Sequence, residues 1–147
     1  MTSHSQSKPI LYTPSTINTL PPESFPPDSP ANNNNQNHNQ TNETVTWRTL
    51  LSTPKTQSDS LSAGLARCPP GKNLALHRHT QAEIYHVTGG TGVVVIEGDE
   101  YRVGAGSVVF IPGDAEHGVR NEGEVDFEWL YVFPTGAFGD VVYRFSG

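Results

Sequence analysis

Three of the six histidines in the chain form, with one glutamate, a pattern whose residue types and spacing could bind a metal. His77 and His79 are two residues apart, Glu83 follows after three further residues, and His117 comes later in the chain. Three neutral imidazoles and a carboxylate suit a divalent ion such as iron, manganese, nickel, copper or zinc. Four such ligands would leave positions on an octahedral ion for water, dioxygen or a chelating substrate. The four residues are therefore a candidate metal site, although a His-x-His pair alone is more often a polar surface feature.

Strand alternation decides which neighbouring side chains can face such a site. It would place His77 and His79 on one face of a strand, and Tyr85 on the same face as Glu83 of the next strand. The Tyr85 phenol is therefore a candidate catalytic proton donor. Core packing is the alternative for Tyr85, because aromatic residues in strands usually pack. His86 has the opposite parity and should lie at the surface or in packing away from the metal.

The elements that must position these residues are short strands. From residue 45 onward, short apolar runs alternate with glycine and proline, which is typical of an all-β sandwich or barrel. The expected strands are 61–67, 74–79, 83–87, 92–97, 101–103, 107–111 and 127–133. The last alternates aromatic residues from Phe127 to Phe133, so one aromatic face should point into the core. Residues 97–100, which include a glycine, indicate a tight hairpin turn.

The first part of the chain has a different composition. It contains proline pairs and a tract from Asn32 to Asn42 that is almost entirely Asn and Gln, with few apolar residues to offset the entropy of ordering. We therefore expect a disordered N-terminal tail over 1–43 and one folded domain over 44–147. Such polar tracts are commoner in eukaryotic proteins, and a filamentous fungus would be a reasonable source.

Charge and composition exclude several function classes. The formal net charge of −6, without a basic patch, argues against nucleic acid as a partner. No apolar run is long enough to span a membrane, and the first ten residues lack the apolar core of a signal peptide. The single cysteine, Cys68, cannot form an internal disulfide. We expect a cytoplasmic protein with a buried Cys68, a reactive thiol being the alternative.

The spacing of these residues resembles the two sequence motifs of the cupin superfamily. The first motif is G-x5-H-x-H, three or four residues, E-x6-G, and its fixed positions are matched by Gly71, His77, His79, Glu83 and Gly90. The second motif is G-x5-P-x-G-x2-H-x3-N, and four of its fixed positions are matched by Gly106, Pro112, His117 and Asn121. Asp114 replaces the family's glycine. We expect Gly113 to take the unusual backbone angle of this turn, with Asp114 bonding to its own backbone.

This resemblance implies a cupin jelly-roll β-barrel with one divalent metal ion inside. It implies that the metal ligands are His77, His79, Glu83 and His117, and that Asn121 and the motif glycines are structural. It further implies a homodimer, which would also cover an exposed sheet edge.

The chain also resembles the small single-cupin oxidoreductases of fungal polyketide gene clusters. That resemblance implies a metal-dependent oxidoreductase, with iron as the first choice of metal. Its substrate would be a small molecule, aromatic or polyketide-derived, in secondary-metabolite biosynthesis. Two alternatives stay open: a redox-neutral decarboxylase, isomerase or lyase, and a non-catalytic metal-dependent protein that binds a small molecule.

Overall fold

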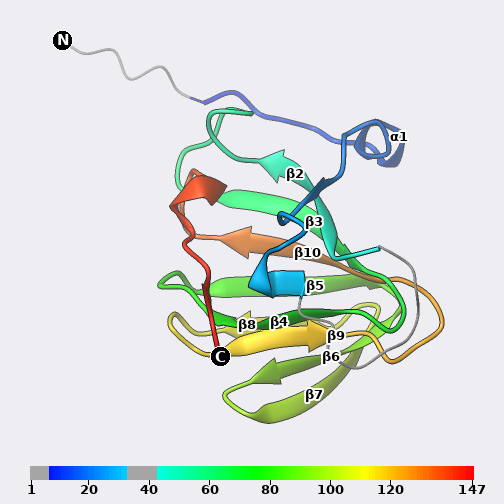
Figure 1. Cartoon of the computed structure of the whole chain (residues 1–147). Coiled ribbons are helices and arrows are strands. Elements are labelled where there is room, and N and C mark those ends of the chain that lie inside the picture. The colour runs from blue at the N-terminus through cyan, green and yellow to red at the C-terminus, as the bar shows by residue number, and fades with distance from the viewer. Residues whose placement is uncertain (1–6, 33–42) are drawn as a thin grey trace.

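Two antiparallel sheets form the barrel in the computed structural model, which describes residues 7–32 and 43–147 (Figure 1). The six-stranded sheet has the order β1 (Glu23–Ser24), β2 (Thr46–Leu51), β3 (Ser62–Cys68), β10 (Phe127–Phe133), β5 (Glu83–Gly89) and β8 (Val108–Ile111). The five-stranded sheet has the order β11 (Arg144–Phe145), β4 (Asn73–Arg78), β9 (His117–Arg120), β6 (Thr91–Ile96) and β7 (Asp99–Gly104). The expected all-β jelly-roll is confirmed.

Helical structure among the described residues is short. It consists of α1 (Pro14–Ile17) and the 3-10 turns η1 (Pro30–Asn32) and η2 (Phe138–Asp140). None of these helices is long and apolar enough to cross a membrane.

The centre of the barrel is filled from β10. This strand pairs with β3 on one side and β5 on the other, and its inward aromatic side chains are at most 6% exposed. Burying each large apolar side chain contributes about 1.5–3 kcal/mol, so this strand is a major source of stability. Gly64 of β3 lies opposite the Tyr131 hydroxyl, where a Cβ atom would overlap the phenol. Glycine at this position therefore makes room for the ring.

Four strands lie outside the ranges expected from the sequence: the two-residue strands β1 and β11, and the longer strands β2 and β9. β9 has four residues and begins His117-Gly118, so it is too short to display a period. β2 has six residues that are all half-buried. Its sequence, TWRTLL, shows no regular alternation of apolar and polar residues. β2 is defined by pairing with β1 and β3, and β9 by pairing with β4 and β6, which are more distant in the sequence.

The structure confirms one of the two turn conformations expected from the sequence and differs from the other. Between β6 and β7, Glu97 and Gly98 both have positive φ, 48° and 84°, and the expected tight hairpin is confirmed. In the second motif the expectation is wrong, because Asp114 itself takes the left-handed conformation at φ 62°. Gly113 is needed for another reason: a Cβ atom there would overlap the carbonyl oxygen of Thr80.

Residues 7–32 differ from the disordered tail expected over 1–43. β1 pairs with β2, the Tyr12 hydroxyl donates a hydrogen bond to the Leu50 carbonyl at 2.8 Å, and Ala31 is 1% exposed. The few apolar and aromatic side chains of this segment find partners on the barrel, which composition alone does not reveal. Residues 1–6 and 33–42 of the expected tail lie outside the described residues. The domain boundary at residue 44 stays a prediction.

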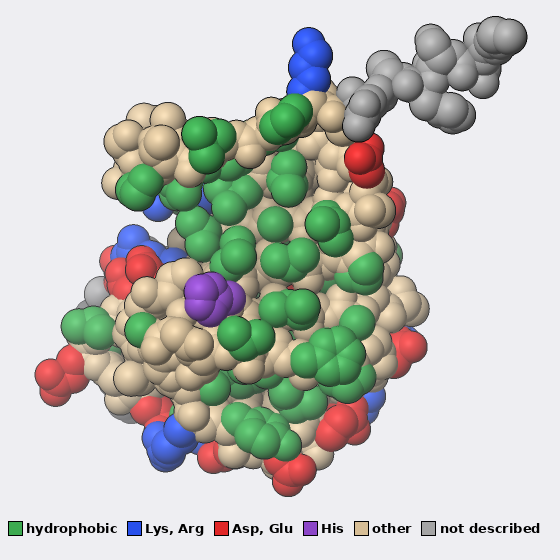
Figure 2. All heavy atoms as spheres, turned by 180° about the vertical axis from the view of Figure 1, so that it is seen from behind, with side chains coloured by type: hydrophobic (Ala, Val, Ile, Leu, Met, Phe, Trp, Pro, Cys, Tyr) green, Lys and Arg blue, Asp and Glu red, His purple; other side chains and the backbone are tan. Residues whose placement is uncertain are grey.

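Apolar side chains also gather on the outer face of the six-stranded sheet. Ile84 of β5 and Phe110 of β8 are cross-strand partners and are 44% and 64% exposed, and Val108 of β8 is 68% exposed. Figure 2 shows one side of the molecule with hydrophobic side chains spread over much of its surface. An exposed apolar area of this kind is typical of an interaction surface.

Candidate metal centre

The four candidate ligands come from both sheets and meet inside the barrel. His77 on β4 and His117 on β9 are direct partners in the strand ladder. His79 follows the end of β4, and Glu83 begins β5 in the opposite sheet. All four are buried, with exposed fractions between 0% and 4%. The structure thus brings together the residues that the motif spacing singled out.

Main-chain hydrogen bonds orient each imidazole ring. The Nδ1 atoms of the three histidines lie 2.8, 2.9 and 2.9 Å from the carbonyl oxygens of Ala75, Gln81 and Ala115. A carbonyl oxygen can only accept, so each Nδ1 carries the proton and each Nε2 has a free lone pair. This tautomer is the one required of a histidine that binds a metal through Nε2.

The free atoms converge on one point. The three histidines can each offer a ring nitrogen such that the nitrogens lie within 4.8 Å of one another. Glu83 Oε2 lies 3.2 Å from His79 Nε2 and 3.3 Å from His117 Nε2. None of these four atoms has a hydrogen-bond partner among the described residues. Buried lone pairs that face one another are unfavourable unless a cation lies between them, so the donor set fits a divalent metal ion.

Burial keeps the His77 ring in the form that binds a metal. Burial, with repulsion from His117 and His79, lowers the pKa of His77 from its ordinary 6.5 to about 3, although its hydrogen bond to Ala75 opposes the shift. His77 is therefore neutral at physiological pH, and no proton has to leave its Nε2 before a metal binds.

A small aromatic cavity adjoins Glu83. Its volume is about 20 Å³, and it is lined by Phe25, Val45, Trp47, Ala66, Leu74, Glu83, Tyr85, Trp129, Tyr131, Phe138 and Tyr143. Two polar atoms of the lining residues, Trp47 Nε1 and the Tyr131 hydroxyl, are buried without a hydrogen bond that meets ordinary geometry. They are potential hydrogen-bond donors to a ligand in a chamber whose walls are mostly aromatic.

Tyr85 lies where strand parity places it, on the inner face with Glu83. It is 1% exposed, and its ring centre is 5.4 Å from that of Trp129, so it packs in the core and also lines the cavity. Burial raises the pKa of the Tyr85 phenol well above its ordinary value, and the charge of Glu83 adds to the effect. The phenol is therefore protonated. His86 lies on the outer face, as expected.

Sequence reasoning missed a group of aromatic residues beside the histidines. The Tyr143 ring lies 4.7 Å from the ring of His77 and 5.4 Å from that of His79, and the Phe145 ring lies 5.7 Å from that of His77. Both follow the last expected strand, in a segment without a motif. Their i, i+2 spacing was the available signal, since it is the period of a strand.

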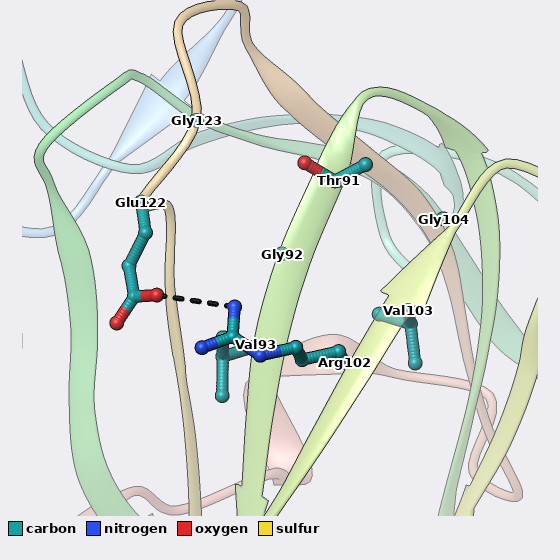
Figure 3. A pocket seen from close by; sticks show the side chains of 8 residues that line it. All are labelled: Thr91, Gly92, Val93, Arg102, Val103, Gly104, Glu122 and Gly123. Atoms are coloured by element: carbon teal, nitrogen blue, oxygen red, sulfur yellow. Dashed lines mark hydrogen bonds and ion pairs between the residues drawn. The ribbon is translucent and has the colours of Figure 1, made fainter.

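Cys68 and two arginines lie outside the cavity. Cys68 is fully buried, and burial raises the pKa of its thiol to about 12, which does not favour a reactive thiol. Arg67 pairs with Asp126 at 2.7 Å. Arg102 pairs with Glu122 at 3.3 Å across a separate surface pocket of about 450 Å³ (Figure 3). Both arginines therefore have surface partners and do not line the cavity beside Glu83.

The chain is similar in sequence to two curated proteins of known activity. The chain is 37% identical over 102 residues to dimethylsulfoniopropionate lyase DddW of Ruegeria pomeroyi, a match that covers 69% of this chain and 66% of the lyase. It is 38% identical over 68 residues to 5-aminosalicylate 1,2-dioxygenase of a Comamonas species, covering 46% of this chain and 18% of the dioxygenase. The chain thus spans just under two thirds of the lyase and a small part of the dioxygenase.

A solved structure and a family model add to these two matches. The polyketide cyclase RemF of Streptomyces resistomycificus superposes with a TM-score of 0.71 at 19% identity, over 97% of this chain and 87% of the cyclase. At that identity the likeness concerns the fold alone. The model of the cupin domain family matches residues 64–133, a range that contains all four candidate ligands. Residues 64–133 of this chain therefore form a cupin domain.

Proposed function

We propose that this chain is a metal-dependent enzyme in which His77, His79, Glu83 and His117 hold one divalent metal ion. The observation that carries the proposal is the convergence of four buried, unpartnered ligand atoms from these residues. Main-chain hydrogen bonds hold the three rings in place, so the site is organised before the metal arrives.

We propose redox-neutral lyase chemistry as the reaction. The support is the 37% identity to a dimethylsulfoniopropionate lyase together with a cavity whose polar groups suit proton transfer. A substrate of that class carries a carboxylate at one end and a sulfonium cation at the other. A bound divalent ion would polarise a substrate oxygen and supply positive charge beside Glu83.

The residues that line the cavity would then have different roles in the reaction. Aromatic walls exclude water and favour a sulfonium group through cation–π contact. Trp47 Nε1, which has no hydrogen-bond partner, would donate a hydrogen bond to a substrate acceptor, and the Tyr131 hydroxyl would donate a second. In the elimination, a base takes a proton from the carbon beside the substrate carboxylate, a C=C bond forms, the C–S bond breaks and dimethyl sulfide leaves with its electron pair. Tyr85, beside Glu83, would act as this base after losing its own phenolic proton, a loss that the positive charge of a bound metal ion would favour.

A second candidate is the oxidoreductase expected from the sequence, acting with iron on an aromatic or polyketide-derived substrate. The aromatic lining of the cavity and the 38% identity to an aromatic-ring dioxygenase over 68 residues favour it. Metal-dependent binding of a small molecule without catalysis is a third alternative. A cytoplasmic location and a role in secondary metabolism stay predictions.

Metal analysis of ligand variants tests the site. Alanine at His77, His79 or His117 should lower bound metal at least about 10-fold, because water replaces a lost protein ligand poorly. Glu83→Gln should retain the shape of the side chain while weakening the anionic ligand. His86→Ala is the matched control, since this histidine lies on the outer face. Full metal content in the His77 and His117 variants would overturn the assignment.

Product analysis separates the reactions. The metal-loaded protein is incubated with dimethylsulfoniopropionate, and released dimethyl sulfide is measured by gas chromatography. In parallel, oxygen uptake is followed with 5-aminosalicylate. Release that is lost in Tyr85→Phe while metal is retained supports the lyase, and oxygen uptake supports the oxidoreductase. Neither activity, with tight binding of either compound, would favour the binding protein.

A further inference from the structure

The cavity beside Glu83 is too small for a substrate. The candidate ligands are at most 4% exposed, and the cavity of about 20 Å³ has room for about one water molecule. Pockets that bind small molecules usually have about 300–1,000 Å³. A part of the wall must therefore move before a substrate can reach the ligands.

Phe25 lies at the outer end of the aromatic stack on this wall. Its ring centre lies 4.9 Å from that of Trp47, 5.3 Å from that of Tyr143 and 6.0 Å from that of Phe145. The Tyr143 and Phe145 rings in turn lie against His77. Phe25 thus lies over the aromatic layer that covers the histidines, and it also lines the cavity.

The segment that carries Phe25 has few attachments. We call residues 20–25 the strap. Its ladder with β2 contains only two residue pairs, and β1 is the outermost strand of its sheet. One hydrogen bond holds the start of the strap: the Arg48 side chain donates from Nε to the Leu20 carbonyl oxygen at 2.9 Å.

One side chain makes the remaining polar contacts of the strap. The Glu23 carboxylate accepts hydrogen bonds from the Thr49 hydroxyl and from the Lys55 ammonium group. The Lys55 side chain is 58% exposed, so its ion pair with Glu23 is screened by water and salt. A strap held in this way can be released without disturbing the barrel.

We infer that the strap is the gate of the cavity, with Phe25 as its closing wall residue and Glu23 as its latch. Lifting the strap removes Phe25 from Trp47 and Tyr143 and opens the chamber toward the histidines. That the admitted molecule is a substrate rests on the proposed function. The movement of the strap does not.

Hydrogen exchange at the Trp47 indole tests this inference without metal or substrate. The chain has two tryptophans, so two indole N–H signals are expected by NMR, and Trp47→Phe assigns them. Trp47 Nε1 makes no hydrogen bond, so burial alone protects its proton and each opening exposes it.

Glu23→Ala should accelerate this exchange about two- to fivefold, since it removes both latch contacts. Phe25→Ala should accelerate it as well. Glu122→Ala is the matched control, because that carboxylate likewise binds two side chains, Arg102 and Arg120, but lies away from the strap. An unchanged rate is expected there.

Arg144→Ala tests the competing gate, the C-terminal segment. Arg144 ties that segment to Asp114 at 2.5 Å. Acceleration in Arg144→Ala with none in Glu23→Ala would overturn the inference, and so would equal rates in all the variants. Failure of the metal analysis with accelerated exchange in Glu23→Ala would overturn the proposed function and leave the gate intact.

Discussion

Replacing Asn121 by alanine removes three hydrogen bonds from one buried side chain. Asn121 Nδ2 donates to the carbonyl oxygens of Cys68 and Val125 at 2.9 and 2.8 Å, and its Oδ1 accepts from the Gly123 main chain at 2.9 Å. These bonds tie the end of β3 to the loop between β9 and β10. The side chain is 2% exposed, so water cannot readily replace them.

The magnitude follows from the number of bonds. A typical intramolecular hydrogen bond contributes about 1 kcal/mol to stability, so we expect Asn121→Ala to lower the free energy of unfolding by about 3 kcal/mol. Urea unfolding of the metal-free protein measures this difference, provided that the m-value is unchanged. Asn121 is not a candidate ligand, so metal binding by the folded variant should be retained.

Two outcomes would refute this reasoning. A loss below about 1 kcal/mol would mean that the three bonds are replaced by others. Loss of metal at unchanged stability would mean that Asn121 acts on the site and not on the loop. Glu122→Ala is the surface control, and its effect should stay within about 0.5 kcal/mol.

The remaining predictions concern acid stability, thiol reactivity and assembly. The depressed pKa of His77, about 3 in the folded protein against 6.5, means that the metal-free protein loses stability as the pH falls from 6.5 toward 3, by up to about 1.4 kcal/mol per pH unit. Urea titrations at several pH values check this, and a flat profile for the metal-free protein would contradict it. Cys68 should react with a thiol reagent only on unfolding, since its pKa is about 12 and its side chain is buried; rapid labelling of the native protein would show otherwise. The expected homodimer should form through the apolar face of the six-stranded sheet, so light scattering should find twice the chain mass, and Phe110→Ser should weaken the dimer while Arg102→Ser should not. A chain mass for the parent at micromolar concentration would count against it.

Strand periodicity accounts for much of what could be predicted. β10 has the bounds expected from its alternating aromatic residues, and Glu83 and Tyr85 share the inner face while His86 lies outside. These features depend on backbone geometry that repeats every two residues, so a sequence displays them directly. The short strand β9 was missed because four residues display no period, although His117 within it was identified from its motif.

The backbone conformation of a single residue was harder to predict from the sequence. The left-handed angle at the second motif falls on Asp114 and not on Gly113, because Gly113 is needed where the chain passes the Thr80 carbonyl. A sequence lists the residues that tolerate such an angle but not which of them the neighbouring chain leaves free to adopt it.

The sequence by itself determined the fold class and the four candidate ligands, because residue type, spacing and strand alternation are local properties. The tertiary structure alone decided how the site is enclosed. Phe25, Tyr143 and Phe145 come from opposite ends of the chain and meet over His77, and residues 7–32 lie against the barrel despite a composition typical of a tail. Contacts between segments so distant in sequence are selected by the shape of the folded surface, and no local pattern encodes them.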